Sequence, residues 1–340
     1  MTKQYTVAVV GATGLVGQTM IEILEQRRFP LARLVPLASS RSAGETCRCL
    51  GKEYTVGDLE EHDFAGVDLA LFSAGGAVSA EHAPRAAGAG AVVIDNTSFF
   101  RYDEDVPLVV PEVNPEAIAA YTARGIIANP NCSTIQLVVA LKPIHDESRI
   151  TRVNVATYQA VSGAGRTAME RLARQTALLM NGKPLDEASG LMQQAFNAVP
   201  AIDVFEDSGY TREEMKLHRE TRKILSDDEI SVNATAVRIP VFFGHSEAVH
   251  LETTQPISVS RARELLSDSA GIVLMDEPGE GAYPTPAGEA AGQDGVFVGR
   301  IRSDVTHPNG LNMWIVADNV RKGAALNSVQ IAEILVKSYL

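Results

Sequence analysis

Cys132 is the residue in this chain whose position most directly suggests chemistry. It lies in 129-NPNCSTIQLVV-139, immediately before an apolar run with helical spacing. The N–H groups and dipole at a helix N-terminus stabilise a thiolate, which makes a cysteine nucleophilic near neutral pH. The side chains of Asn129 and Asn131 can fix the turn or donate to a reacting carbonyl. A small buried cysteine at a strand end explains the position equally well, so this stretch alone leaves both interpretations open.

A cysteine nucleophile needs an acid or base nearby, and His245 is the best placed of the 7 histidines. In 237-VRIPVFFGHSEAVHLE-252 it follows an apolar strand and a glycine, which predicts a strand end in a polar turn. Arg238 lies within the apolar strand, where a charge requires a partner. A substrate carboxylate and a structural ion pair are equally good partners on the local sequence.

Three glycines between a strand and a helix indicate a dinucleotide site near the N-terminus. The stretch 7-VAVVGATGLVGQTMIEILEQ-26 places Gly11, Gly14 and Gly17 between a β-branched run and an amphipathic helical run. Such glycines let the backbone approach a pyrophosphate, whose charge is met by N–H groups at the helix N-terminus. Glycine turns also join strands to helices for packing reasons alone, but the strand–turn–helix context favours a nucleotide.

The residues after the next predicted strand bear on which dinucleotide binds. An NAD site offers an acidic residue there to the ribose hydroxyls. Here 34-LVPLAS-39 ends in Ser39 and is followed by Arg41 and Ser42. Because a guanidinium and hydroxyls suit a 2′-phosphate, we expect NADP. The alternative is a solvent-exposed loop, which commonly collects serine and arginine.

The elements that position these residues form an expected two-domain α/β architecture. Residues 5–135 alternate short β-branched runs with helical or glycine-rich connections, as in a parallel sheet covered by helices. Later strands are longer and more alternating, which predicts a mixed or antiparallel sheet. We expect a Rossmann-type dinucleotide-binding domain of residues 1–131 with 319–340, and an α+β second domain of residues 132–318.

Composition limits the classes of partner. A net charge of −12 without basic runs disfavours nucleic acid, and no apolar segment is long enough for a membrane span. An odd number of cysteines, 3, without a recognisable secretion signal favours reduced thiols and a cytoplasmic location. Cys47 and Cys49 lack the further ligands of a zinc site, so we expect no metal and a structural role for both.

Motifs along essentially the whole chain resemble those of the aspartate-β-semialdehyde dehydrogenase family. NPNCST, with the spacing from Arg238 to His245 in RIPVFFGHSEAV, is very specific, whereas GATGLVG also occurs in other reductases. The remaining matches, in family order, are ASSRSAG, SAGG at 73–76, IDNTSFFR ending at Arg101, VPEVN at 110–114, YQAVSGAGR at 158–166, EEMK ending at Lys216, and DNVRKGAA at 318–325.

The resemblance implies a role for each matching catalytic residue. Cys132 is expected to be the acylated nucleophile and His245 the acid/base, while Gln159 helps to hold the substrate. Asn131 is a candidate oxyanion donor. The expected substrate-binding residues are Arg238 for the α-carboxylate, Glu213 for the amino group, and Arg101 with Lys216 for phosphate.

Local sequence alone favours another explanation for Glu213 and Lys216. The stretch 211-TREEMKLHRETRKIL-225 has the pattern of a charged, solvent-facing helix. Thr211 and Glu214 fit a capping box, and Glu213 and Lys216 fit a helical ion pair.

For the coenzyme, the resemblance implies a pyrophosphate at Thr13 to Val16, a 2′-phosphate at Arg41 and Ser42, and a carboxamide at Asn319. Ser162 and Gly163 are expected near the nicotinamide. The full set of expected cofactor-binding residues is Gly11, Thr13, Gly14, Leu15, Val16, Gly17, Ser39, Arg41, Ser42, Gly75, Ser162, Gly163 and Asn319.

The implied activity is NADP-dependent reduction of L-4-aspartyl phosphate to L-aspartate 4-semialdehyde through a Cys132 thioester. The family works as a cytosolic homodimer in lysine, threonine and methionine biosynthesis, with the second domain forming the dimer. The chemistry is coherent, because a thiolate can displace phosphate from an acyl phosphate and a nicotinamide can reduce the thioester.

Three alternatives are weighed against this activity. N-acetyl-γ-glutamyl-phosphate reductase typically has Pro-Gly-Cys-Tyr where this chain has Pro-Asn-Cys-Ser. A phosphorylating glyceraldehyde-phosphate dehydrogenase would show Ser-Cys-Thr-Thr-Asn around its thiol. A non-catalytic NADP-binding paralogue is disfavoured by the intact set of Cys132, Gln159, Arg238 and His245.

Overall fold

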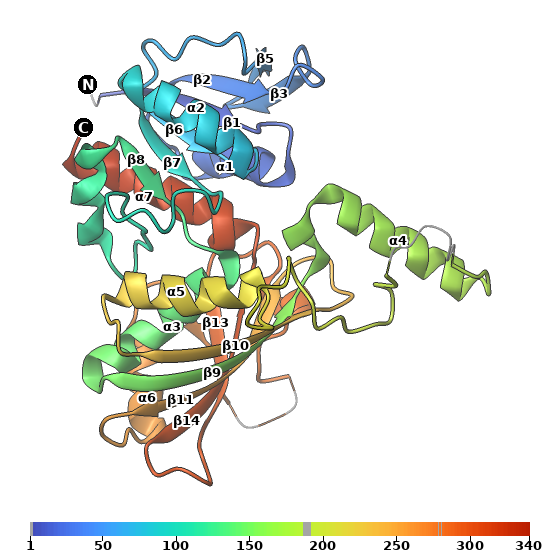
Figure 1. Ribbon diagram of the computed structural model, residues 1–340, viewed down its shortest axis with the longest axis vertical. Helices are drawn as coiled ribbons and strands as arrows, with labels where there is room; N and C mark the ends of the chain where they lie inside the picture. The colour runs from blue at the N-terminus through green and yellow to red at the C-terminus, as the bar shows by residue number, and fades with distance from the viewer. Residues whose placement is uncertain (1–2, 186–191, 278, 280) are drawn as a thin grey trace. The chain divides into compact units, whose positions relative to one another are not determined.

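The computed structural model describes residues 3–185, 192–277, 279 and 281–340. The chain divides into two compact units (Figure 1): Met1–Asn131 with Gly323–Leu340, and Cys132–Lys322. The sequence prediction placed the last boundary between residues 318 and 319 instead. No helix among the described residues is long and apolar enough to cross a membrane.

The first unit is built on a parallel sheet with strand order β5-β2-β1-β6-β7-β8. Its central strands are buried on both faces, as their nearly continuous apolar sequences require. The order is that of a Rossmann fold, which confirms the expected class. The strands are β1 (Tyr5–Val10), β2 (Leu31–Ala38), β5 (Gly57–Asp58), β6 (Leu69–Phe72), β7 (Val92–Asp95) and β8 (Ile126–Ala128), with β3 (Thr46–Cys49) and β4 (Lys52–Thr55) forming a separate hairpin.

Helices from both ends of the sequence complete the core of this unit. α1 (Leu15–Gln26) and the C-terminal α7 (Leu326–Ser338) pack in one apolar cluster with β1. Ile23 and Ile331 are both fully buried there, and truncating either to alanine would cost about 2–5 kcal/mol. α2 (Gly76–Gly88) and the 3-10 helix η1 (Pro115–Ala123) pack against β7 and β8 respectively.

The second unit contains a mixed sheet with strand order β10-β9-β11-β14-β13-β12. β9 pairs in parallel with β10, and β12 with β13, whereas the other pairs are antiparallel. The mixed sheet expected from the alternating strands is therefore confirmed. The strands are β9 (Ile150–Gln159), β10 (Ser231–Arg238), β11 (His245–Thr253), β12 (Ile272–Leu274), β13 (Val296–Ser303) and β14 (Gly310–Ala317).

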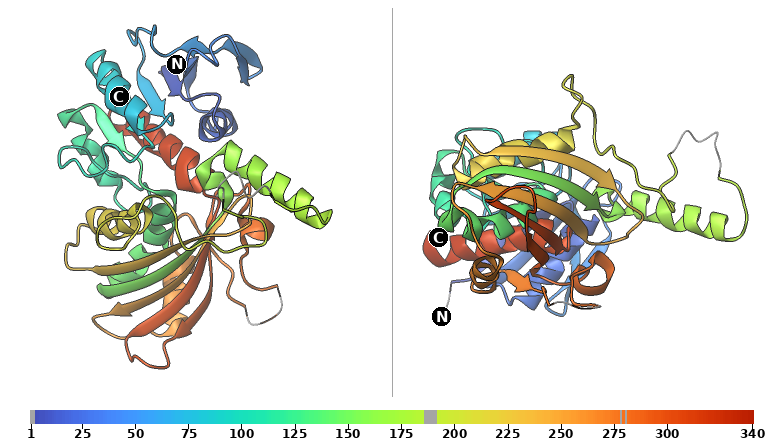
Figure 2. Two further views of the ribbon diagram at one scale, coloured as in Figure 1. Left: turned by 45° about the vertical axis from the view of Figure 1, so that its right-hand side comes forward. Right: turned by 90° about the horizontal axis from the view of Figure 1, so that it is seen from below.

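Helices α3 (Cys132–Glu147), α5 (Arg212–Leu225) and α6 (Val259–Ser267) pack on one face of this sheet. The right-hand view of Figure 2 looks onto the opposite face, whose central strands carry no helix. Burial alternates along β9 and β10 accordingly, as period-2 strands with one covered face require. α4 (Arg166–Met180) and the 3-10 helix η2 (Val161–Ala164) follow β9 in this unit.

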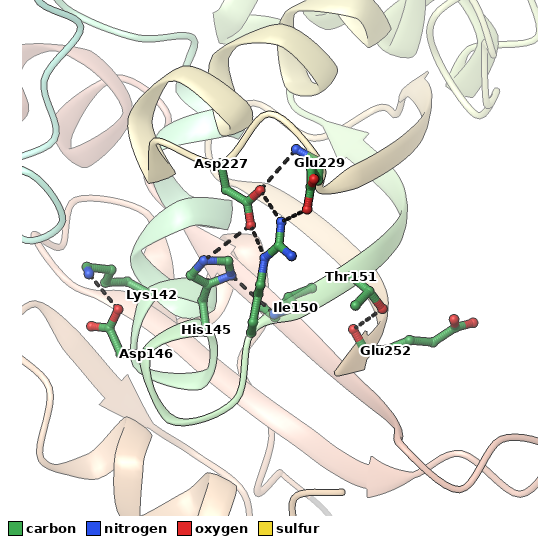
Figure 3. Close-up of polar contacts among 9 residues, drawn as sticks. Lys142, His145, Asp146, Ile150, Thr151, Asp227, Glu229 and Glu252 are labelled. Atoms are coloured by element: carbon green, nitrogen blue, oxygen red, sulfur yellow. Dashed lines mark hydrogen bonds and ion pairs between the residues drawn. The ribbon is translucent and has the colours of Figure 1, made fainter. Parts of the chain in front are cut away.

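The carboxyl end of α3 is tied to the end of α5 by a polar cluster (Figure 3). Arg149 donates to both carboxylate oxygens of Asp227, at 2.8 and 2.7 Å, and to Glu229 at 2.7 Å. His145 accepts the backbone N–H of Ile150 at Nδ1, and its Nε2 lies 3.7 Å from Asp227. Hydrogen bonds from Arg149 lower the pKa of Asp227 below its ordinary value. This cluster anchors the helix whose first residue is Cys132.

Candidate active site

Strand pairing brings three of the predicted site residues to one end of the second sheet. Parallel pairing sets Arg238 at the end of β10 opposite Gln159 at the end of β9. Because β11 runs antiparallel to β9, its first residue, His245, lies at the same end. His245 in turn faces Ala317, the last residue of β14, and Asn319 follows shortly after. The half-buried Cys132 begins α3, which packs on this sheet.

His245 is fully buried, and its two ring nitrogens have different surroundings. Nδ1 accepts the backbone N–H of Ala160 at 3.1 Å, whereas Nε2 has no hydrogen-bond partner within the described chain. Burial, reinforced by the charge of Arg238, lowers the pKa of His245 to about 3, although Glu213 and the Gly244 backbone oppose this. The imidazole is therefore neutral at physiological pH.

Arg238 also bonds to Ala160, because its Nη1 donates to the Ala160 carbonyl oxygen at 2.7 Å. Burial lowers the pKa of the guanidinium, and the charges of Cys132 and Glu213 counteract that effect. Among the described residues, no carboxylate lies within ion-pair distance of Arg238. A mostly buried guanidinium bonded to a neutral carbonyl suits an anionic ligand group or a thiolate.

A hydrogen-bonded chain joins Gln159 to Lys216. Nε2 of Gln159 lies 3.0 Å from both Ser133 Oγ and Glu213 Oε1. The other oxygen of Glu213 accepts from Lys216 at 3.0 Å, and Lys216 also contacts Asp203 at 2.9 Å. Burial alone would lower the pKa of Lys216, but the two carboxylates raise it, so the ammonium stays charged.

Part of the local interpretation of α5 is confirmed and part is wrong. The Thr211–Glu214 capping box and the Glu213–Lys216 ion pair are both present. The helix does not simply face solvent, because Glu213 is only 5% exposed. The buried carboxylate is partnered by Gln159, from a distant segment, and by Lys216 on the same helix.

Asn319 and Gly163 line the same end of the sheet. Oδ1 of Asn319 accepts the Gly244 N–H at 3.0 Å, and its amide group contacts Ser162 Oγ. A Cβ on Gly163 would lie 3.1 Å from Arg238 Nη1 and 3.3 Å from His245 Nε2. Only a residue without a side chain leaves that space open.

Ser133, Ala160 and Asp203 were not singled out from the sequence. The first two directly follow Cys132 and Gln159, so adjacency was the only available signal. Asp203 adopts a left-handed conformation, with φ 68°, which aspartate tolerates better than most residues. Nothing in its own neighbourhood indicated a partner on α5.

The glycine loop of the first unit has the geometry that a dinucleotide site requires. Gly11 follows β1 with φ 87°, and a Cβ on Gly17 would lie 2.1 Å from the Gly11 carbonyl oxygen. These two glycines let α1 start close against the strand, with Gly14 at its N-cap. Thr13 lies in the turn and Leu15 and Val16 in the first turn of α1, where N–H groups can meet an anion.

Other predicted cofactor-binding residues follow neighbouring strands at the carboxyl edge of the first sheet. Ser39 follows β2, and its carbonyl accepts the N–H of Ser42 at 2.9 Å, so the exposed Arg41 lies within a tight turn. Gly75, with φ 103°, is the N-cap of α2 after β6. Such an edge is where doubly wound sheets bind ligands.

Two predicted residues, Arg101 and Asn131, belong to the first unit. Both are buried, and Arg101 Nη2 donates to the Asn96 carbonyl at 2.8 Å. Cys47 and Cys49 lie in the β3–β4 hairpin, and burial raises the pKa of both thiols, that of Cys49 to about 11. Such thiols are poor nucleophiles, in keeping with a structural role.

Comparison with known proteins agrees with both units. Residues 6–121 match the family model for the semialdehyde dehydrogenase NAD binding domain, and residues 141–322 match that for its dimerisation domain. Aspartate-semialdehyde dehydrogenase from Legionella pneumophila is 58% identical over 100% of this chain and 98% of its own length. The chain belongs to the aspartate-semialdehyde dehydrogenase family.

Solved structures of aspartate-semialdehyde dehydrogenases share the whole fold. Aspartate semialdehyde dehydrogenase II from Vibrio cholerae, in complex with ASA, has a TM-score of 0.97 at 56% identity and 100% coverage of both chains. The Candida albicans enzyme with NADP has a TM-score of 0.75 at 27% identity, with 98% of each chain covered. Membership of the aspartate-semialdehyde dehydrogenase family makes this chain an oxidoreductase, and the alternative families are not supported.

Proposed function

We propose that this chain reduces L-4-aspartyl phosphate to L-aspartate 4-semialdehyde with NADPH, through a thioester at Cys132. The observation that carries the proposal is the meeting of Gln159, Arg238 and His245 at one end of the sheet on which α3, the helix that begins at Cys132, packs. The thiolate forms a bond to the acyl carbon, and the bond from that carbon to the phosphate oxygen breaks. Bound NADPH would supply the hydride that reduces the thioester carbon.

Charges around the thiol suit this substrate. Arg238 binds the α-carboxylate, and its mostly buried guanidinium, without a carboxylate partner among the described residues, supports this role. Glu213 binds the amino group and Lys216 binds phosphate, which is also the role proposed for Arg101. Asp203 and Glu213 keep Lys216 cationic, which phosphate binding requires.

Arg41 and its neighbouring serines select NADP over NAD. The exposed guanidinium follows β2, where an NAD-type site carries an acidic residue. The NAD binding domain match supports a nicotinamide cofactor, and the relative from Candida albicans was solved with NADP.

The protein works as a homodimer that uses the uncovered face of the second sheet. That face presents Tyr158 beside Trp314, with ring centroids 5.6 Å apart and ring planes tilted by 49°, and it presents His250, whose Nε2 lies 2.7 Å from Asp304 Oδ2. A dimerisation domain model covers this sheet, which supports the assignment. The biosynthetic role implies a cytoplasmic location.

Phosphate-dependent formation of NADPH from aspartate semialdehyde tests the proposal, with N-acetylglutamate semialdehyde as the competing substrate. Wild-type protein should prefer the first substrate, and Cys132→Ala should abolish turnover. Cys47→Ala is the control, because that thiol lies in the β3–β4 hairpin. Full activity of Cys132→Ala would refute the thioester, and preference for the acetylated substrate would refute the assignment.

A further inference from the structure

Asp95, at the end of β7, is a buried carboxylate that the proposed reaction does not use. Its Oδ1 accepts the backbone N–H of Thr97 at 3.0 Å and the hydroxyl of Ser79, on α2, at 2.8 Å. Its Oδ2 accepts the Thr97 hydroxyl at 2.7 Å. Burial raises the pKa of Asp95, whereas these bonds and the charge of Arg101 oppose the rise. A neutral residue would avoid the free-energy cost of burying a charge, so the carboxylate indicates a role for its charge.

The carboxylate closes a turn at the carboxyl end of β7. The hydroxyl of Thr97, which donates to Asp95, accepts the N–H of Phe99 at 3.3 Å. The backbone N–H and the side-chain amide of the intervening Asn96 both donate to the Phe72 carbonyl on β6, at 2.9 and 3.1 Å. The turn is therefore fixed by its own side chains and by the neighbouring strand.

The backbone of this turn also holds the guanidinium of Arg101. Nη2 of Arg101 donates to the Asn96 carbonyl oxygen at 2.8 Å, and the hydroxyl of Ser328 on α7 donates to the Asn96 side-chain oxygen at 3.0 Å. The Arg101 charge is close enough to the Asp95 carboxylate to stabilise it. Because Arg101 is held in this way and is only 5% exposed, its guanidinium is oriented by the protein. Such preorganisation removes part of the entropy cost of binding an anion.

The shape of the turn does not require a negative charge. An asparagine at position 95 could accept the Thr97 N–H through its amide oxygen and donate its amide N–H to the Thr97 hydroxyl. An amide cannot supply the electrostatic attraction to Arg101. The charge of Asp95 therefore acts on the guanidinium that the same turn orients.

We propose that Asp95 is a positioning residue: its carboxylate fixes the turn of residues 95–99 and attracts the Arg101 guanidinium, so that Arg101 is held in the orientation that binds the substrate phosphate. This inference rests on the proposed function, in which Arg101 binds phosphate. Asp95 acts through Arg101 and exchanges no proton with the substrate.

The direction of the effect distinguishes positioning from a passive negative charge. A carboxylate beside a phosphate site repels the phosphate, so loss of its charge alone should strengthen phosphate binding. If Asp95 positions Arg101, loss of the charge should weaken phosphate binding, because the guanidinium is no longer held. The two roles therefore predict opposite changes in the KM for phosphate.

Phosphate-dependent NADPH formation from aspartate semialdehyde, with phosphate varied, measures that KM. Asp95→Asn should raise it about 10-fold and change the KM for NADP little. Arg101→Ala should raise it about 10–100-fold, the effect of losing a charged hydrogen-bond donor. In the Arg101→Ala background, Asp95→Asn should add no further rise, since the group on which Asp95 acts is gone. Asp68→Asn is the matched control, because that carboxylate accepts the Thr6 N–H at 2.7 Å at the opposite edge of the same sheet.

Ser79→Ala provides a milder variant in case Asp95→Asn does not fold. It removes one donor to the carboxylate and keeps the negative charge. It should raise the KM for phosphate about 2–5-fold, the effect of one neutral hydrogen bond, and only when Arg101 is present. No rise in the presence of Arg101 would contradict the proposal.

The double-variant comparison also separates this inference from the proposed function. An unchanged or lower KM for phosphate in folded Asp95→Asn, with Arg101→Ala raising it, would refute the positioning role and leave the proposed function standing. An equal rise from Asp95→Asn in both backgrounds would show a general structural defect and would also overturn the inference. If Arg101→Ala left the KM for phosphate unchanged, the phosphate role of Arg101 would fail, and the inference would fail with it.

Discussion

The side-chain oxygen of Asn319 accepts the backbone N–H of Gly244 at 3.0 Å, one residue before His245. This bond crosses from the end of β14 to the start of β11, two strands that pair directly. Asn319 therefore fixes the turn that positions the His245 imidazole. This role is separate from any contact that Asn319 makes with the coenzyme.

Asn319→Ala should lower kcat by about 10–100-fold, because small displacements of reacting groups carry penalties of that size. The KM for NADP should change little if positioning dominates, which steady-state kinetics with varied coenzyme will measure. Asn309→Ala, whose side chain bonds to Thr253 at the other end of β11, is the matched control. A large rise in KM for NADP with unchanged kcat would instead favour the carboxamide role.

Glu247 should destabilise the protein as pH rises. Its carboxyl is fully buried on β11, and burial raises its pKa well above 4.5. The Gln136 amide opposes this shift, although neither carboxyl oxygen reaches hydrogen-bond geometry with any described residue. In the unfolded chain the Glu247 carboxyl ionises near its ordinary pKa, whereas in the native state it stays protonated to higher pH. The native state is therefore favoured fully below the unfolded pKa, and this stability is lost as pH rises from the unfolded pKa through the native pKa.

Glu247→Gln should therefore raise Tm at pH 8 and change it little at pH 4. The rise should be a few degrees for each kcal/mol gained in the free energy of unfolding. Thermal melts at both pH values measure the effect. Glu252→Gln on the same strand serves as the control, since that side chain is half-buried on the other face. An equal shift at both pH values would mean that packing, and not ionisation, is responsible.

Asp227, unlike Glu247, should stabilise the protein at neutral pH and lose this effect in acid. Arg149 lowers its pKa below the ordinary 3.8, so its contribution is present above that value and is lost as pH falls through the native pKa. Asp227→Asn should melt below wild type at pH 7, and the difference should shrink in acid. Asp228→Asn, its exposed neighbour, should behave like wild type. A difference that persisted unchanged into strong acid would contradict the ionic origin.

Arg41→Ala should weaken NADP binding about 10–100-fold, the effect of losing charge-assisted hydrogen bonds to a phosphate. NAD binding should barely change, because NAD lacks the 2′-phosphate. Fluorescence titration with both coenzymes gives the ratio. Arg33→Ala, an exposed arginine within β2, is the control. An unchanged NADP to NAD ratio would remove Arg41 from the coenzyme site.

Local sequence was sufficient wherever the deciding interactions are local. Cys132 was expected at a helix start, and α3 begins there. The capping box at Thr211 and Glu214 was recognised because its members are three residues apart. The parallel and mixed sheets followed from the continuous apolar runs of the first unit and the alternating runs of the second, and burial along the strands agrees.

Interactions across strands were beyond local reasoning. Glu213 is buried against Gln159, and its helical partner Lys216 also pairs with Asp203. No pattern within α5 reveals Gln159 or Asp203. The use of the Ala160 main chain by two side chains could not be read from residue type, because every non-proline residue offers the same N–H and carbonyl.

The use of the Ala160 main chain by two site residues has an evolutionary consequence. Because its contacts to His245 and Arg238 are made by main-chain atoms, substitutions at position 160 are constrained by volume and backbone preference instead of by side-chain chemistry. A saturation library at this codon should retain glycine, serine and other compact residues and eliminate bulky ones. The link between His245 and Arg238 would then persist in relatives with a different residue at position 160. A search for conserved polar side chains would not detect it.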